Sequence, residues 1–128
     1  MARRNILQGS KFEELAGYSC AVVDDPWVFV SGTTGYDYAA DRISDDITEQ
    51  TEQAFINIEW ALNEAGASLG DVVRVRVFLG DGEYFEAVAA VLSRVFASVR
   101  PANTTLVPSL IDPAMKVEIE VTAKIRET

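Results

Sequence analysis

The chain has 128 residues, of which 48% are hydrophobic, and these values predict one compact domain over residues 1–128. It contains no histidine and a single cysteine, Cys20, which excludes histidine-dependent nucleophiles, internal disulfides and multi-cysteine zinc sites. A net charge of −9 works against binding nucleic acid, because phosphate contacts need clustered lysine and arginine side chains.

The N-terminal quarter of the chain predicts a β-hairpin after an unstructured start. Met1–Arg4 is basic but lacks the apolar stretch of a secretory signal, so we expect a frayed terminus and a cytoplasmic protein. Two short β-rich runs, Tyr18–Val23 and Trp27–Gly32, flank the acidic turn Asp24-Asp25-Pro26. No apolar run approaches the roughly eighteen residues that a membrane span needs, so we expect no membrane partner.

A helix is predicted next, after a polar loop over Thr33–Asp46. Asp46 followed by Glu49 is typical of a helix start, in which the first side chain accepts hydrogen bonds from free backbone N–H groups. Gly66 stands where a glycine would end the helix. Between them the apolar stripe recurs at spacings of three and four: Ile47, Thr51, Ala54, Phe55, Ile58, Ala61, Leu62 and Ala65.

The second half of the chain predicts a strand, a helix and two further strands. Asp71–Leu79 alternates, with Val73, Val75, Val77 and Leu79 on one face and Arg74, Arg76 and Phe78 on the other. Asp81 can cap a helix that Arg100-Pro101 ends, because a residue before proline is pushed out of the helical region. Thr104–Val107 is a short strand, and Lys116–Arg126 alternates most clearly.

This order of elements predicts an α+β domain of two related halves, with a mixed sheet and both helices on one sheet face. The other face would carry charged and apolar side chains together: Arg74, Arg76, Phe78, Glu118 and Glu120. Such a face is too charged for a core and too apolar for solvent alone. We therefore expect a closed homo-oligomer that covers it.

Glu118 and Glu120 are the first candidates for chemistry, because they point the same way about 7 Å apart on one strand face. One interpretation is the pair of carboxylates found in glycosidases. The other is ion pairing with Arg74 and Arg76, across strands or between subunits. Ion pairing is the better interpretation of Glu120, and for Glu118 both interpretations stay open.

Other polar residues carry weaker signals. Ser31–Gly35 is a small-residue turn that lacks the Gly-Lys-Ser/Thr of a phosphate loop, although its backbone N–H groups could hold an anion. Tyr18 could donate a hydrogen bond into a cleft or fill a core or interface. Cys20 has no histidine to activate it, so we expect an inert thiol. No metal-ligand spacing is present, and we expect no metal and no cofactor.

Short motifs in matching order and spacing resemble the Rid family, also called RidA or YjgF-like and labelled L-PSP endoribonuclease. The likeness runs from Ile6 to Ile125. It is carried by Ala16-Gly17-Tyr18, Val30-Ser31-Gly32, Val77-Phe78, Arg100-Pro101-Ala102 and Val117-Glu118-Ile119-Glu120. The resemblance implies a chorismate-mutase-like fold, a homotrimer with clefts between neighbouring subunits, and cofactor-free hydrolysis of imines or enamines to carbonyl compounds and ammonia.

The family's cleft residues carry over unevenly to this sequence. The resemblance assigns Tyr18 and the water-handling Glu118 to the cleft, together with a turn at Ser31, Gly32 and Thr33, where glutamine is commoner at the last position. Where the family has an arginine that grips the substrate carboxylate, this chain has Asn103. An amide offers one neutral donor in place of two charge-assisted bonds, and losing a charged hydrogen bond costs roughly 1.5–3 kcal/mol. We therefore predict weak or absent activity on 2-aminoacrylate-type imino acids.

Two hypotheses follow for the function. In the first, the chain is an imine or enamine hydrolase (deaminase) with another substrate, in which Glu118 orients water, Tyr18 positions the substrate, and Asn103 and the backbone N–H near Thr104 hold a neutral acceptor. The alternative is a non-catalytic, ligand-binding or chaperone-like trimer. Ribonuclease activity is disfavoured by the acidic charge and the absence of histidine. Whether Arg100, three residues from Asn103, compensates for the missing arginine stays open.

Overall fold

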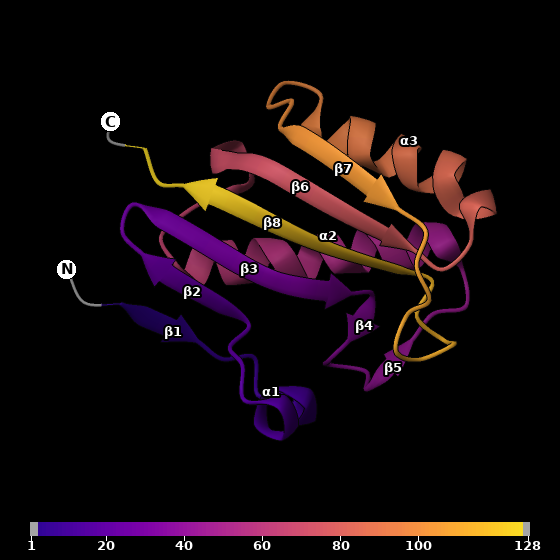
Figure 1. The fold of residues 1–128 in the computed structure, drawn as a ribbon, viewed down its shortest axis with the longest axis horizontal. Helices are drawn as coiled ribbons and strands as arrows, with labels where there is room; N and C mark the ends of the chain where they lie inside the picture. The colour runs from indigo at the N-terminus through magenta and orange to yellow at the C-terminus, as the bar shows by residue number, and fades with distance from the viewer. Residues whose placement is uncertain (1–2, 127–128) are drawn as a thin grey trace.

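The computed structural model describes residues 3–126, which form the expected α+β fold around a six-stranded mixed sheet with the order β1-β2-β3-β8-β6-β7 (Figure 1). Its strands are β1 (Arg4–Ile6), β2 (Ala21–Asp24), β3 (Trp27–Thr34), β8 (Val117–Lys124), β6 (Val72–Leu79) and β7 (Ala102–Leu106). Neighbouring strands are antiparallel, except that β6 and β7 are parallel. The N-terminal and C-terminal halves therefore meet along β3 and β8, in the middle of the sheet.

The two long helices, α2 (Ile47–Glu64) and α3 (Phe85–Phe96), cover one face of this sheet, as predicted (Figure 1). The Asp46 side chain accepts a hydrogen bond from the Glu49 backbone N–H at 2.9 Å, which confirms the predicted helix start. Gly66, with φ of 82°, follows the end of α2 in the left-handed conformation that favours glycine. Within residues 3–126, neither helix nor any other is long and apolar enough to cross a membrane.

The hydrophobic core lies between these helices and the sheet. The inward face of β8 is buried throughout, and the apolar stripe of α2 packs on it. A register shift between Val72 and Arg74 changes the predicted alternation of β6 at its start. Val72 is buried there and Val73 is only partly buried, because the shift leaves one extra residue without a partner in the hydrogen-bond ladder between β6 and β8.

The N-terminal prediction was wrong in two respects. Arg4 begins strand β1, whereas Met1 and Ala2 lie outside the described residues. A short helix, α1 (Lys11–Ala16), follows, so Tyr18 lies in a loop after α1 and β2 starts only at Ala21. The missed signal is a capping box: Glu13 N–H donates to the Ser10 hydroxyl, while the Glu13 carboxylate accepts from Ser10 N–H at 2.9 Å.

The predicted polar loop over 33–46 contains further structure. Strand β3 continues to Thr34, and a two-stranded hairpin follows, made of β4 (Tyr36–Asp37) and β5 (Arg42–Ile43). The Asn57 amide of α2 donates to the Tyr36 carbonyl at 2.8 Å and ties the hairpin to the helix. At Gly35 the chain passes so close to α2 that an added Cβ would lie 2.3 Å from the Gln50 carbonyl oxygen. The hairpin is therefore fixed beside the helix.

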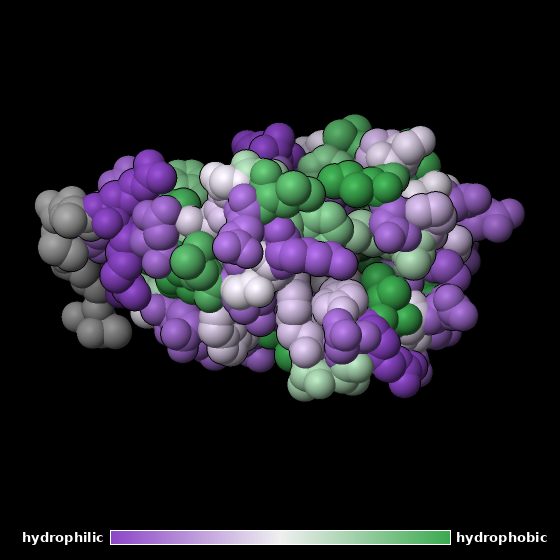
Figure 2. All heavy atoms as spheres, turned by 90° about the horizontal axis from the view of Figure 1, so that it is seen from below, coloured by the Kyte–Doolittle hydropathy of each residue, from purple (hydrophilic) through white to green (hydrophobic). Residues whose placement is uncertain are grey.

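The sheet face away from α2 and α3 carries large exposed side chains, as predicted. Trp27, Phe29 and Leu106 are all exposed there, and the Lys124 ammonium lies over the Trp27 ring, 5.4 Å from its centroid. We call this surface the open face. Figure 2 shows a different surface, seen from below the view of Figure 1, on which apolar side chains form separate groups among hydrophilic ones.

Candidate functional site

Glu118 lies on the open face of β8 between two neighbouring strands. It pairs in register with Thr34 of β3 on one side and with Phe78 of β6 on the other. The register of β3 shifts between Val30 and Thr33, and this irregularity brings Gly32 against the carboxylate. A Cβ added at Gly32 would lie 2.8 Å from Glu118 Oε2, so only glycine leaves the carboxylate this position.

The two glutamates of this strand differ in their partners. Glu120 forms an ion pair with Arg76, its cross-strand neighbour, which confirms the ion-pair interpretation for Glu120. Arg74 stands opposite Thr122 instead. In the part of the chain from residue 3 to 126, no basic side chain pairs with Glu118. Burial raises the pKa of the half-buried Glu118 carboxyl, and the nearby charge of Glu120 raises this pKa further.

Tyr18 lies on the loop that Gly17 starts in the left-handed conformation, and 42% of its surface is exposed. Burial raises the pKa of its phenol first, and the charges of Glu13 and Glu118 raise this pKa further. Within one protomer the structure brings Gly32 and the Glu118 carboxylate together.

Tyr38 is a second phenol with a raised pKa, and the sequence analysis did not single it out. Burial raises its pKa, with further increases from the charges of Cys20 and Tyr18. Tyr38 stands on the β4–β5 hairpin, in the segment that was predicted to be a loop. The available signal was Tyr36-Asp37-Tyr38, a short alternation of aromatic and polar residues.

Cys20 is unsuited to be a nucleophile. Its thiol is half-buried and lies 3.9 Å from the Gln8 side-chain oxygen. Burial, and then the charge of Glu13, raises the pKa of the thiol to about 11. A thiol with so high a pKa stays protonated at neutral pH, as expected for an inert cysteine.

The hydroxyl protons of Ser31 and Thr33 are already engaged in the turn. Ser31 Oγ donates to the Ser19 carbonyl at 2.6 Å, and Thr33 Oγ1 donates to the Ser31 carbonyl at 2.8 Å. Ser31 N–H also donates to the Cys20 carbonyl at 2.9 Å. These bonds fix the irregular segment of β3 that places Gly32 beside Glu118. In this protomer the two hydroxyls therefore shape the site.

Asn103 and Thr104 lie on β7, at the edge of the sheet. Asn103 stands in register with the buried Val75 and so faces α3, whereas Thr104 stands in register with Arg76 and faces the open side. Because β6 separates β7 from β8, the Asn103 side chain and the Glu118 carboxylate lie two strands apart and on opposite faces. A single protomer therefore does not bring Asn103 together with Tyr18 and Glu118.

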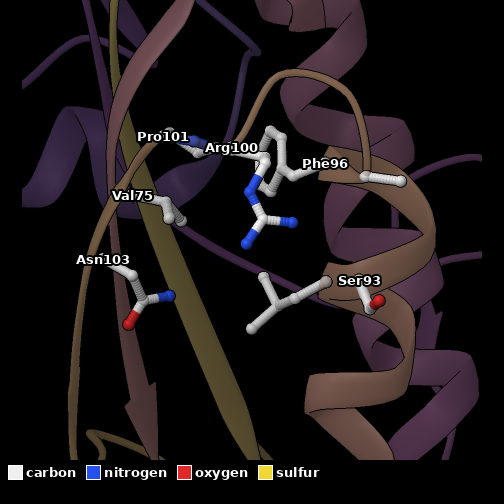
Figure 3. A pocket seen from close by; sticks show the side chains of 8 residues that line it. Val75, Ser93, Phe96, Arg100, Pro101 and Asn103 are labelled. Atoms are coloured by element: carbon white, nitrogen blue, oxygen red, sulfur yellow. The ribbon is translucent and has the colours of Figure 1, made fainter.

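Asn103 instead lines a groove between α3 and β7, with a volume of about 370 Å³ (Figure 3). The Arg100 side chain extends into the same groove, toward Ser93. The sequence analysis left the position of Arg100 open, and the structure places its guanidinium beside Asn103. We call this hollow the Arg100 groove.

Comparison with known proteins identifies the family. The model of the family described as endoribonuclease L-PSP matches residues 8–125. The chain belongs to this family, the Rid or YjgF family. A RutC family protein of Pyrococcus abyssi is 33% identical to this Rid-family chain, over 96% of this chain and 98% of that protein. A 2-iminobutanoate/2-iminopropanoate deaminase of Capra hircus is 33% identical, over 94% of this chain and 89% of that protein.

A solved structure confirms the fold of this Rid-family chain. It is a member of the YjgF/YER057c/UK114 family from Mycobacterium tuberculosis, 41% identical in sequence. The match covers 97% of this chain and 100% of that one, with a TM-score of 0.88. The resemblance read from short sequence motifs is therefore confirmed at the level of family and fold.

Proposed function

We propose that this Rid-family chain is a cofactor-free hydrolase of imines or enamines, which works in clefts between the subunits of a homotrimer. The observation that carries the proposal is Glu118, a half-buried carboxylate without an ion-pair partner in residues 3–126, next to a glycine turn. Relatives named as iminobutanoate/iminopropanoate deaminases support the reaction class.

Glu118 acts as the general base in this proposal. Water attacks the imine carbon while one of its protons passes to the carboxylate, and the imine nitrogen takes up a proton from solvent. The resulting carbinolamine then loses ammonia: the C–N bond breaks, the nitrogen leaves with the proton from Glu118, and the C=O bond forms as the hydroxyl proton passes to solvent. A raised pKa suits this role, because it brings the carboxyl closer to the operating pH.

Tyr18 and the turn at Ser31–Thr33 hold the substrate against Glu118 in this scheme. Gly32 leaves room for it, because a side chain there would occupy the space next to the carboxylate. We propose that Asn103 and the backbone N–H near Thr104 reach the same cleft from a neighbouring subunit. Such sharing is required by the proposal, since one protomer holds Asn103 and Glu118 on opposite sheet faces.

The open face supports the proposed homotrimer. It carries Trp27, Phe29 and Leu106 exposed beside the Arg76–Glu120 pair, a mixture common at subunit interfaces. Packing three open faces around a common axis would cover these side chains and bring the edge strand β7 of one subunit near β3 and β8 of the next. The expected location is the cytoplasm, without nucleic acid or membrane as a partner.

The substrate in this proposal differs from simple 2-imino acids. Asn103 stands where the family resemblance places a carboxylate-gripping arginine, and its amide replaces a bidentate, charge-assisted contact by neutral hydrogen bonds. A carboxylate directly attached to the imine carbon would then bind about ten- to one-hundred-fold more weakly. Imines and enamines without that carboxylate are the expected substrates.

The test is ammonia release from a panel of freshly generated imines, with and without a carboxylate on the imine carbon. We expect release above the uncatalysed rate for at least one neutral imine, and little acceleration for 2-aminoacrylate. The alternative function, a ligand-binding trimer without turnover, would show thermal stabilisation by a panel member and no added ammonia. That second result would contradict the proposed hydrolase.

A further inference from the structure

The Arg100 groove has the size and lining of a small-molecule site. Its volume of about 370 Å³ falls in the range typical of ligand pockets. Its walls combine apolar side chains, Val75 on β6 and Leu92 and Phe96 on α3, with polar ones. Arg100 and Asn103 supply the polar groups at its β7 side, and Figure 3 shows both side chains directed into the hollow.

The backbone holds Arg100 in place at an unfavourable conformation. Its φ is 50°, in the left-handed region that glycine adopts most easily, and its N–H donates to the Phe96 carbonyl at 2.9 Å. This bond closes the end of α3, and Pro101 directs the chain straight into β7. Strain of this kind at a non-glycine residue is often found at functional positions, so the presence of arginine here calls for an explanation.

Arg100 and Asn103 offer hydrogen-bond donors to the groove. Asn103 Oδ1 already accepts the Thr105 hydroxyl at 2.8 Å, which leaves the Asn103 NH₂ group for a ligand. Among residues 3–126, no carboxylate pairs with Arg100. The other arginine of this region, Arg94, is already bonded to Glu52 at 2.7 Å. A guanidinium and an amide NH₂ thus converge in a hollow with apolar walls.

We propose that the Arg100 groove binds a small organic carboxylate with a short aliphatic chain. The guanidinium pairs with the two carboxylate oxygens, the Asn103 amide donates a further bond, and Val75, Leu92 and Phe96 contact the aliphatic part. This site shares Asn103 with the proposed hydrolase but does not rest on it, because binding requires no turnover. It also places the positive charge three residues before the position that the family resemblance gives to arginine.

Binding is tested with isovalerate as the probe and isovaleramide, its uncharged analogue, as the matched control. Backbone N–H spectra of the intact protein are recorded while each compound is added. We expect saturable shifts from isovalerate among residues 92–103, and added salt should weaken this binding. Isovaleramide should bind at least about ten-fold more weakly than isovalerate. Equal binding of the two compounds, or shifts confined to other residues, would overturn the proposal.

Variants of Arg100 and Arg94 show which positive charge binds isovalerate. Arg100→Gln is expected to weaken isovalerate binding about ten-fold or more, whereas Arg94→Gln, on the neighbouring helix α3 and paired with Glu52, leaves it unchanged. An undiminished affinity in Arg100→Gln contradicts the proposal. If that variant fails to fold, Arg100→Gly removes the same side chain and suits the left-handed conformation.

Ammonia release by the same variants separates this proposal from the hydrolase proposal. Loss of isovalerate binding in Arg100→Gln with unchanged hydrolysis of a neutral imine supports both. Isovalerate binding by a protein that releases no ammonia supports the groove and contradicts the hydrolase. Hydrolysis by a protein that does not distinguish isovalerate from isovaleramide contradicts the groove alone.

Discussion

Glu118 and Glu120 stand two residues apart on the same face of β8, yet their surroundings differ in every respect that matters for chemistry. Glu120 faces Arg76 across the strand and forms an ion pair. Glu118 faces Phe78 on that side and lies against Gly32 on the other. The identical side chains are therefore an acid in an ion pair and an acid without a basic partner whose pKa is raised.

The cross-strand neighbours cause this difference, and the neighbours are set by register. Opposite residues in an antiparallel pair contact each other, so a shift in register would give both glutamates different neighbours. The irregularity of β3 between Val30 and Thr33 adds the second element, because it brings a residue without a side chain to the Glu118 carboxylate. The register therefore gives Glu120 an ion-pair partner and leaves Glu118 beside Gly32, at the candidate site.

The largest expected effect is a difference in hydrolysis rate between variants of Glu118 and Glu120. Glu118→Gln is expected to lower the rate of imine hydrolysis about 10²- to 10⁴-fold, because the amide cannot accept the proton of water. Glu120→Gln, the matched control on the same strand face, is expected to change the rate by less than about three-fold. Steady-state ammonia release measures both. Equal losses in the two variants would show that the carboxylates act as a pair, contrary to this comparison.

A smaller effect is expected from Gly32→Ala. The added Cβ would lie 2.8 Å from Glu118 Oε2 and would push the carboxylate aside. Because the end of a flexible side chain can move, we expect little loss of stability but a rate about ten-fold lower. Gly82→Ala is the control, since nothing lies within 4 Å of a Cβ added there. An unchanged rate in Gly32→Ala would mean that Glu118 need not occupy this position.

The pH dependence of stability also distinguishes the glutamates. The folded-state pKa of Glu118 is raised, so its ionisation costs more in the folded protein than in the unfolded chain. This cost is absent below the ordinary pKa of 4.5 and develops as the pH rises through the raised pKa. Glu118→Gln should therefore melt at a higher temperature than the wild type at pH 7, with the difference vanishing near pH 4.

Calorimetric scans of Glu118→Gln and Glu120→Gln across this pH range show whether each variant melts above or below the wild type. Glu120→Gln should not become more stable than the wild type at pH 7, because it loses an ion pair. A Glu118→Gln variant that is less stable than the wild type at neutral pH would contradict the account of a carboxylate that is buried without a cationic partner.

The smallest effect is expected from Arg76→Gln. The Arg76–Glu120 pair is partly exposed in a single protomer, with 51% of the Arg76 side-chain surface accessible, so water screens it unless a neighbouring subunit covers it. Its loss should lower the free energy of unfolding by at most about 1 kcal/mol, and less at high salt. Denaturant titration at low and high salt measures this. A loss of several kcal/mol would show that the open face is dry in the assembled protein.

Long periodic segments were predictable from the sequence, and short ones were not. The apolar stripe of α2 and the alternation of β8 each extend over enough residues to distinguish a helical spacing from a strand spacing. Helix α1 and the β4–β5 hairpin are too short for periodicity, and their signals were a capping box and a pair of tyrosines.

The candidate site was predictable only as residue types. The glutamate, the tyrosine and the glycine turn could be named, but the contact of Gly32 with Glu118 depends on an irregularity that no pattern encodes. The direction of Asn103 likewise follows from its parallel pairing with Val75, which is a tertiary fact. The position of the Arg100 guanidinium depends on a left-handed residue at the end of α3.

The central claim is that Asn103 of one subunit and Glu118 of another share a cleft, and this requires an assembly. Sedimentation equilibrium at micromolar protein concentration tests it most directly. The account predicts a single species of about 42 kDa, three times the chain mass of 14.0 kDa. A species of 14.0 kDa that persists as the concentration is raised would contradict it, because one protomer holds these two side chains on opposite faces of its sheet.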